Sequence, residues 1–130
     1  MAGIKLVLVY MTARDARQAR RIGDALVQER LAACVNVLGP ISSVYRWKGA
    51  LQRGREVAFI AKTRASLLPR LQSRVGELHD YEVPCVVAVP LVGGGPAFLD
   101  WVAAETAVSR SGVRPAGRSA SGSKAAAAPR

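Results

Sequence analysis

The sequence predicts an α+β domain in which two βαβ units share one antiparallel sheet. Four apolar segments alternate with amphipathic ones in the order βαββαβ, and a further helical segment follows the last strand. The 130 residues are 50% hydrophobic, which is enough for one packed core. We therefore expect a single folded domain over residues 1–110.

The first strand and helix have the clearest pattern. Residues 4–12 are apolar on both faces, as is typical of a central strand. Thr12 and Asp15 then resemble a capping box, and a stripe that contains Ile22 and Leu26 predicts a helix to about residue 31.

Two long strands joined by a hairpin are expected next. Residues 32–47 predict a strand interrupted at Gly39-Pro40, because a proline without its N–H is tolerated only at a sheet edge or a bulge. Residues 56–63 alternate as the partner strand, and the turn lies at Lys48-Gly49 or at Arg53-Gly54. The pair predicts a long antiparallel ribbon with one edge strand.

The second half repeats the pattern. Residues 66–79 predict a helix capped by Ser66 with Pro69 in its first turn, residues 83–91 a fourth strand, and residues 96–106 a third helix. Right-handed crossovers then give the sheet order 4-1-3-2, which is the ferredoxin-like βαββαβ sandwich with an extra C-terminal helix. Cys34 and Cys85 fall on the two opposite edges, too far apart for a disulfide.

The charge is strongly positive and uneven. The formal net charge is +10, and residues 111–130 hold four basic residues and no acid among Ser, Gly, Ala and Pro. This composition predicts a disordered basic tail, able to attract nucleic acid only without sequence preference. No long uncharged apolar run and no cleavage-site pattern is present, so we expect a cytoplasmic protein that does not enter a membrane.

No catalytic motif is found, and we expect no enzymatic activity. The single histidine, His79, has no Ser or Cys at a motif spacing, and the glycines at 93–95 lack the lysine of a phosphate loop. His79 and Glu82 can offer an imidazole and a carboxylate to a transition metal, although two ligands are few. The alternative is that His79 bonds the last carbonyls of the helix it ends.

Two features suggest contacts outside the core. Tyr45 and Trp47 share one face of the predicted edge strand, which indicates self-assembly through the hairpin, with packing inside one chain as the alternative. Lys62 ends an otherwise apolar strand, and we expect it to pair with Glu56 or Glu82, or to reach an anion in a cleft.

Several strings between residues 31 and 101, LAACVN, SVYRWKG, EVAFIAKT, HDYEVP and FLDW, resemble the CutA family of divalent-cation tolerance proteins. That family carries LAACxN, SxYxWxG, ExxxxxKT, HxYExP and YLxW in this order. The resemblance implies a homotrimer of PII-like build, linked to tolerance of copper and other divalent cations, in which hairpins wrap neighbouring subunits and leave clefts. The matching residues expected at the cleft or the trimer interface are Cys34, Tyr45, Trp47, Glu56, Lys62, Thr63, Tyr81, Glu82 and Trp101.

The departures from the family pattern concern metal ligands. Some relatives have a cysteine where this chain has Met11, a thioether that favours Cu(I). The usual HPYExPE is HDYEVPC here, which removes a carboxylate at Cys85 and adds one at Asp80. The resemblance then implies no obligatory cofactor, and at most a weak copper or zinc site at His79 and Met11 or a small-ligand site.

Two other functions use the same topology. An RRM-like RNA-binding module would place several aromatic residues in the third strand, whereas residues 56–61 contain one aromatic residue and an acid. A small acylphosphatase-like enzyme would need an anion-binding nest and an arginine after the first strand. Arg14 lies near that position without a Gly-rich turn before it. The RRM-like module is the main alternative and the enzyme is the least favoured.

Overall fold

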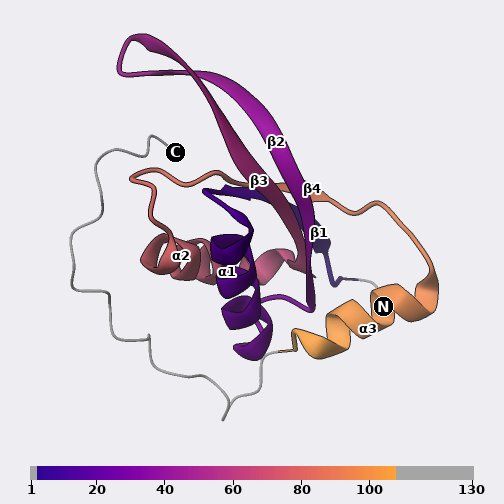
Figure 1. The fold of residues 1–130 in the computed structure, drawn as a ribbon. Helices are drawn as coiled ribbons and strands as arrows, with labels where there is room; N and C mark the ends of the chain where they lie inside the picture. Colours follow the sequence, from indigo (N-terminus) through magenta and orange to yellow (C-terminus); the bar gives the residue numbers. More distant parts are fainter. Residues whose placement is uncertain (1–2, 108–130) are drawn as a thin grey trace.

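The computed structural model describes residues 3–107 and shows one antiparallel sheet with helices packed beside it (Figure 1). The predicted end of the domain at residue 110 and the predicted tail lie outside these residues. The element order is the predicted one, followed by the extra helix. The elements are β1 (Leu6–Ala13), α1 (Ala16–Gln28), β2 (Cys34–Trp47), β3 (Ala50–Arg64), a 3₁₀ turn (Ala65–Leu67), α2 (Leu68–Leu78), β4 (Val86–Pro90) and α3 (Pro96–Glu105).

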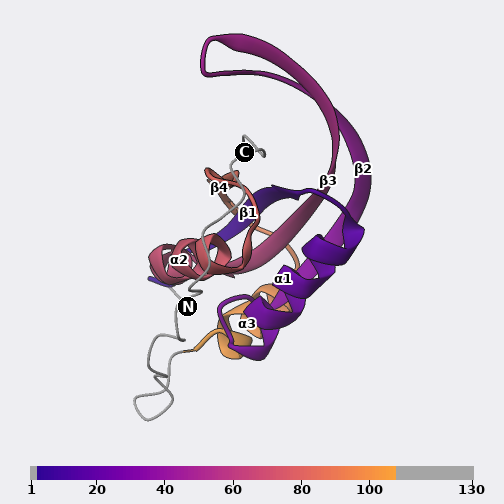
Figure 2. The ribbon, with the colours of Figure 1, turned by 60° about the vertical axis from the view of Figure 1, so that its left-hand side comes forward.

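The sheet has the order β2-β3-β1-β4, which confirms the predicted topology. Every neighbouring pair of strands is antiparallel. Helices α1 and α2 lie side by side against one face of the sheet (Figures 1 and 2). Strand residues on that face alternate with residues on the open face, as the pleat requires. The fully buried residues between sheet and helices include Val9, Met11, Phe59, Ala61, Ile22, Leu26, Leu71 and Val75.

Helix α1 starts later and ends earlier than predicted, because Thr12, the first residue of the predicted capping box, lies in β1. Asp15 is its N-cap and accepts a hydrogen bond of 2.9 Å from the N–H of Gln18. The helix ends at Gln28 because Arg30 adopts a positive φ of 61°. Gly23 allows α1 to lie directly on β2, since a Cβ there would come within 2.9 Å of Val35 Cγ1.

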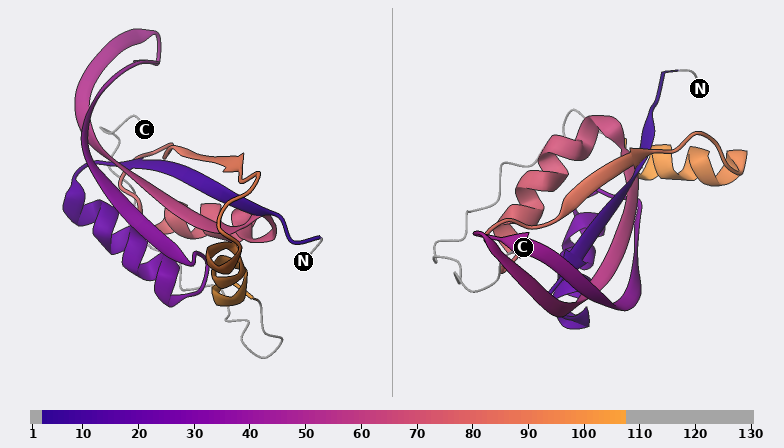
Figure 3. Two further views of the ribbon diagram at one scale, coloured as in Figure 1. Left: turned by 90° about the vertical axis from the view of Figure 1, so that its right-hand side faces the viewer. Right: turned by 90° about the horizontal axis from the view of Figure 1, so that it is seen from above.

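The β2–β3 hairpin is longer than predicted. Its turn is Lys48-Gly49, where both residues have positive φ (52° and 81°), as a two-residue hairpin turn requires. Strand β3 therefore begins at Ala50, and Gly54 lies inside it with open space around its Cα. The predicted irregularity in β2 is present as a register shift between Val37 and Gly39. Beyond the sheet the two strands continue as a curved ribbon (Figure 3).

The later elements agree with prediction in type and order, but the cap of α2 and the bounds of β4 differ. Pro69 lies in the first turn of α2, as predicted, but Ser66 does not cap the helix. A 3₁₀ turn precedes α2, so that Leu67 occupies the N-cap position without a side-chain hydrogen bond. Strand β4 is shorter than residues 83–91 because it pairs only with β1, from Val86 to Pro90.

Helix α3 lies at the end of the sheet where β3 finishes, apart from α1 and α2 (Figure 3). The Arg64 guanidinium donates two hydrogen bonds, of 2.7 and 3.2 Å, to the carbonyl oxygen of Ala103. Arg30 forms an ion pair of 3.2 Å with Glu105. Two arginines, one at the end of β3 and one just after α1, therefore hold α3 in place.

Candidate functional site

His79 follows α2, and its imidazole is buried between that helix and β1. Its Nε2 lies 2.7 Å from the carbonyl oxygen of Thr12, and its Nδ1 accepts a 3.1 Å hydrogen bond from the N–H of Tyr81. Because Nδ1 is the acceptor, the proton is on Nε2 and is donated to Thr12, so the ring is neutral. The ring thus bonds the neighbouring strand, whereas the sequence suggested the last carbonyls of its own helix.

Tyr81 and Glu56 extend this contact into the sheet. The ring centroid of Tyr81 is 4.5 Å from that of His79, and its hydroxyl donates a 3.2 Å hydrogen bond to Glu56 Oε1. Glu56 is only 6% exposed, and a buried carboxylate needs donors of this kind. Three segments, the end of α2, the loop after it and β3, meet here in what we call the His79 cluster (His79, Tyr81 and Glu56).

Arg14 holds the loop after α2 against the start of α1. It forms ion pairs with Asp80 and with Asp15, the latter at 3.0 Å. The hydrogen bond from the Gln18 N–H, followed by the one from Arg14, lowers the pKa of Asp15 below its ordinary value. The guanidinium that sequence reasoning considered for an acylphosphatase-like enzyme is therefore shared by two carboxylates.

Met11, the other predicted metal ligand, is fully buried on the helix-facing side of β1, opposite Phe59. A thioether enclosed in this way reaches an ion only if the core opens. Thr12 Oγ1 is also buried, and no hydrogen-bond partner for it lies within residues 3–107. A metal ion could use His79 only by displacing the Tyr81 N–H or the Thr12 carbonyl from its ring.

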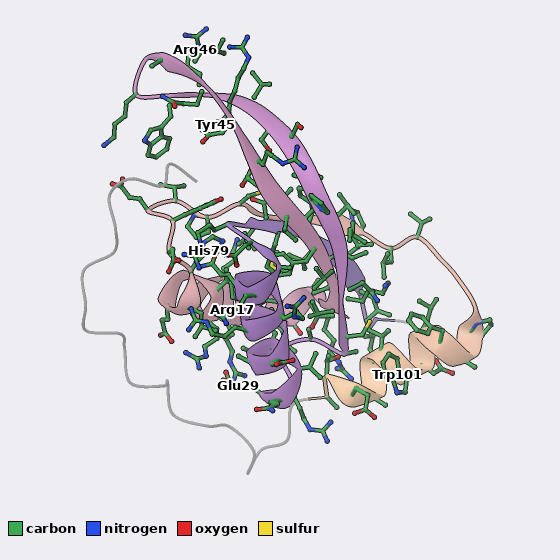
Figure 4. The ribbon with its side chains drawn as sticks, in the orientation of Figure 1. Arg17, Glu29, Tyr45, Arg46, His79 and Trp101 are labelled. Carbon is green, nitrogen blue, oxygen red and sulfur yellow. The ribbon has the colours of Figure 1, made fainter. Side chains whose placement is uncertain are left out.

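Tyr45 and Trp47 lie together on the inner, concave face of the hairpin. Figure 4 shows Tyr45 beneath the curved ribbon and Arg46 on the opposite side. Lys48 Nζ is 5.8 Å from the centroid of the Trp47 ring and 4.0 Å from Glu82 Oε1. Glu82 therefore lies opposite the hairpin tip, and the two aromatic residues line the space beneath the ribbon.

Cys34, Lys62 and Trp101 form a second group at the other end of β3. Cys34 and Lys62 are partners in the strand register. Lys62 Nζ donates a 3.1 Å hydrogen bond to Asn36 Oδ1 and lies 5.9 Å from the centroid of the Phe98 ring. The rings of Phe98 and Trp101 are 5.4 Å apart on α3. An amide and an aromatic ring thus stabilise the ammonium group, and no carboxylate of residues 3–107 forms an ion pair with it.

Apart from Met11 and Thr63, the predicted site residues therefore lie in two places within one chain. Glu56 and Lys62 are separated by about 20 Å along β3, because a strand advances about 3.4 Å per residue. Within one chain Lys62 therefore does not pair with Glu56, and it does not pair with Glu82 either: Lys62 bonds Asn36, and Glu82 lies beside Lys48 at the hairpin tip. Thr63 belongs to neither place, since it is buried and its Oγ1 donates a 2.7 Å hydrogen bond to the carbonyl of Leu31.

The sheet face turned away from α1 and α2 is apolar and largely uncovered over β1 and β4. Tyr10, Val87 and Val89 are exposed on it, and Tyr10 lies between Val87 and Ile60 in the register. A contiguous apolar patch is typical of a surface that contacts another protein. Sequence reasoning did not predict this patch. It could have been inferred from the first strand, whose residues are apolar on both faces although helices cover only one face of the sheet.

Other features of residues 3–107 add no further site of the expected kind. In this part of the chain, no three His, Cys, Asp or Glu side chains are placed to hold one metal ion, and no helix is long and apolar enough to cross a membrane. A pocket of about 540 Å³ lies between the start of β1, the segment after β4 and α3, with Lys5 and Asp100 among mainly apolar walls. None of the predicted site residues lines it.

The chain matches the family model of the CutA1 divalent ion tolerance protein over residues 7–105. It is 41% identical over 99 residues to the divalent-cation tolerance protein CutA of Thermus thermophilus, covering 76% of this chain and 96% of that protein. It is 42% identical over 96 residues to the chloroplastic protein CutA of Arabidopsis thaliana, covering 74% of this chain and 53% of that protein. The chain thus spans about half the length of the plant relative.

Solved structures of similar proteins share the fold. The structure of the divalent cation tolerance protein CutA1 of Thermus thermophilus aligns with a TM-score of 0.76 at 40% identity, over 78% of this chain and 98% of that chain. CutA1 from Oryza sativa aligns with a TM-score of 0.78 at 39% identity, over 82% of this chain and 97% of that chain. The predicted fold class and the family resemblance are both confirmed.

Proposed function

This chain belongs to the CutA1 divalent ion tolerance family, and we propose that it acts as a homotrimer in divalent-cation tolerance, with ligand clefts between subunits and no catalysis. The observation that carries the proposal is the inner face of the hairpin. Tyr45 projects there from a ribbon that extends beyond the sheet (Figure 4), and Trp47, two residues further along β2, lies on the same face. Aromatic residues of this kind are enriched where protein surfaces bury one another, so a second copy of the chain is their partner.

Two further properties of the molecule support self-association. The apolar sheet face around Tyr10 and Val87 is exposed in a single chain. The outer half of the β2–β3 ribbon has only two strands, and such a ribbon is marginally stable alone in water. Its edges also present unpaired backbone groups, which natural proteins cover. Assembly of three chains would bury the apolar face and support the ribbon.

A cleft between subunits also accounts for the division of the site residues. Within one chain, the His79 cluster and the group around Lys62 are too far apart to hold one small ligand. A hairpin from a neighbouring chain can bring residues of one group next to those of the other. The buried hydroxyl of Thr12, which has no hydrogen-bond partner within residues 3–107, supports a polar ligand beside the His79 cluster.

We propose that metal binding in this cleft is weak and not obligatory, with copper or zinc as the ion. His79 would supply a nitrogen ligand, at the expense of one of its present hydrogen bonds. Copper titration of the parent and of His79→Ala, followed by calorimetry, tests this point. The variant should lose the weak site, whereas Met11→Leu should keep it, since the sulfur is enclosed. Equal binding by His79→Ala and the parent would remove His79 from the proposal.

We further propose a cytoplasmic location. Cys34 and Cys85 are free thiols near opposite edges of the sheet, which suits a reducing compartment. The names of relatives differ on this point, since the Arabidopsis protein is called chloroplastic and a structure from Archaeoglobus fulgidus is called periplasmic. Cell fractionation of the full chain, with markers for each compartment, would decide between these locations.

The solution mass of the full chain tests the central proposal. Light scattering should give three times the chain mass of 13.8 kDa over a wide range of protein concentration. A mass of one chain at every concentration would exclude the trimer and would instead favour a monomeric module of the RRM type.

A further inference from the structure

The pocket of about 540 Å³ beside α3 has the size of a small-molecule site. Its walls come from the start of β1, from the segment that leaves β4 and from α3, which turns back from the end of that segment (Figure 1). Pockets that take small organic molecules have volumes of about 300–1,000 Å³. This pocket therefore has room for a ligand of many atoms rather than for a single ion.

Hydrogen bonds to the main chain hold all three walls in place. The carbonyl oxygen of Leu6 accepts a 3.0 Å bond from the N–H of Leu91, which ties the segment after β4 to β1. The carbonyl oxygen of Lys5 accepts one of 2.8 Å from the first residue of the 3₁₀ turn. Helix α3 is held through the Ala103 carbonyl, which accepts from the Arg64 guanidinium. The pocket is thus formed in advance, and a ligand does not have to order its walls.

The lining of the pocket is apolar apart from two opposite charges. Leu6, Leu91 and Leu99 are among its aliphatic walls, and Lys5 and Asp100 are the only charged residues that line it. Both charged residues are exposed, so they lie where the pocket opens to solvent. They form no ion pair with each other or with another group of residues 3–107. Their place at one apolar pocket distinguishes them from the other exposed charges of the domain.

We propose that this pocket binds a small apolar zwitterion, a molecule that carries one ammonium and one carboxylate group on an apolar body. An amino acid with a large apolar side chain and a short apolar peptide both have this chemistry. The ligand carboxylate pairs with the Lys5 ammonium, and the ligand ammonium pairs with the Asp100 carboxylate. The apolar body lies against the leucines and leaves water. Gly93 and Gly94 carry no side chain, so the main chain of this wall can approach the ligand closely.

Ligands with a single charge fit this pocket less well. A fatty acid would pair with Lys5 but would bring its carboxylate close to that of Asp100, and an amine would meet the reverse conflict at Lys5. Like charges placed side by side at a binding site cost affinity. A neutral apolar molecule would gain nothing from either charge. Only a zwitterion uses both groups at the opening of the pocket.

A second copy of the chain is the other occupant to consider. The proposed trimer uses the inner face of the hairpin and the sheet face around Tyr10 and Val87, and none of the residues on these surfaces that carry that proposal lines the pocket. Phe98 and Trp101, which belong to the group around Lys62, do not line it either. The pocket is therefore separate from the contacts on which the proposed assembly rests.

Calorimetric titration of the full chain with matched probes tests the two charge pairs. The probes are phenylalanine, hydrocinnamate, which lacks the ammonium group, and phenethylamine, which lacks the carboxylate. Phenylalanine should bind at least about tenfold more tightly than either analogue, because each analogue loses one charge-assisted hydrogen bond. Leucyl-leucine is a longer zwitterion. Tighter binding of this dipeptide, with the same dependence on Lys5 and Asp100, would support the proposal with a peptide as the ligand.

Two substitutions should each affect one end of the zwitterion. Asp100→Asn should weaken phenylalanine at least about fivefold without weakening hydrocinnamate, which has no ammonium group to lose. Lys5→Met should weaken phenylalanine to a similar extent without weakening phenethylamine. The matched controls are Asp24→Asn and Arg17→Met, at exposed positions on α1, and they should leave the binding of every probe unchanged.

The apolar part of the pocket is tested by filling it. Ala103→Leu adds an isopropyl group to a lining residue and should lower the affinity for phenylalanine at least about tenfold, because it takes the space of the apolar body. Ala104→Leu, at the next position of α3, is exposed and does not line the pocket, so it should bind as the parent does. Unchanged thermal unfolding and solution mass of both variants would separate lost binding from misfolding.

Several results would overturn the proposal. These are no binding of phenylalanine or leucyl-leucine by the parent at about 10 mM ligand, equal affinities for all the probes, or equal losses in Asp100→Asn and Asp24→Asn. A solution mass that falls in Ala103→Leu and not in Ala104→Leu would show instead that a second copy of the chain fills the pocket.

Discussion

The two halves of the β2–β3 ribbon share one register and differ in everything that surrounds them. In the inner half, Val57, Phe59 and Ala61 are buried against the helices. In the outer half, from Ile41 to Trp47 and from Ala50 to Arg55, every side chain is at least partly exposed. Hydrogen-bonded pairing alone therefore does not define a stable structure here. The inner half is supported by its own chain, and the outer half needs a partner.

The largest expected effect comes from the inner half. Phe59→Ala removes a fully buried ring and should lower the free energy of unfolding by about 3–5 kcal/mol. Leu51→Ala, on the exposed face of the outer half, should change it by less than about 0.5 kcal/mol. Urea unfolding at one fixed protein concentration measures both. Comparable losses in the two variants would contradict the division of the ribbon into two halves.

The next prediction concerns assembly through the outer half. Trp47→Ala should shift the mass from three chains towards one at low micromolar concentration, because it removes the largest side chain of the inner face. The far-UV circular dichroism spectrum should stay nearly unchanged. Arg46→Ala, at the adjacent position on the opposite face, is the matched control and should leave the mass unaltered. A Trp47→Ala protein that remains trimeric at nanomolar concentration would show that the hairpin is not the main contact.

The boundary between the two halves of the ribbon lies at Glu56. A substitution that removes a hydrogen bond to Glu56 should lower stability less than Phe59→Ala does. Tyr81→Phe removes the hydroxyl that donates to Glu56 Oε1 and leaves the ring packed on His79. We expect a loss of about 1–2 kcal/mol in the free energy of unfolding, since the acceptor is a buried carboxylate. Urea unfolding measures it, and Tyr10→Phe, on the exposed sheet face, is the control. An unchanged value for Tyr81→Phe would mean that other donors satisfy this carboxylate.

How far the sequence predicted the molecule depends on how local the determining interactions are. Strand β1 and helix α1 were predictable because their apolar patterns lie in adjacent residues, although the N-cap is Asp15 and not Thr12, where the predicted capping box begins. The start of β3 was not, since Arg53-Gly54 resembles a turn and only pairing with β2 shows that the chain continues straight. The register shift next to Gly39 was predictable from the Gly-Pro pair.

The site was harder to predict than the fold, because its contacts join distant segments. Lys62 bonds Asn36 across two strands, and Arg14 bonds Asp80 between two helices. Neither pairing has a signal in the spacing of the residues. The family resemblance named a set of site residues, but one chain divides that set between two ends of β3, and only an assembly could unite them. Sequence patterns thus define the elements, and contacts between elements define the site.

The smallest expected effect belongs to the body of the domain and not to the hairpin. The pKa of Asp15 is lowered in the folded chain, so its carboxylate stabilises the fold above the ordinary value of 3.8 and loses this effect as the pH falls through the folded value. Asp15→Asn keeps a capping side chain and should flatten the acid limb of stability against pH, measured by urea unfolding between about pH 2 and 5. The hairpin variant Arg46→Ala should show the same change of unfolding free energy with pH as the parent. An Asp15→Asn curve that parallels the parent through this range would show that other carboxylates set the acid limit of the fold.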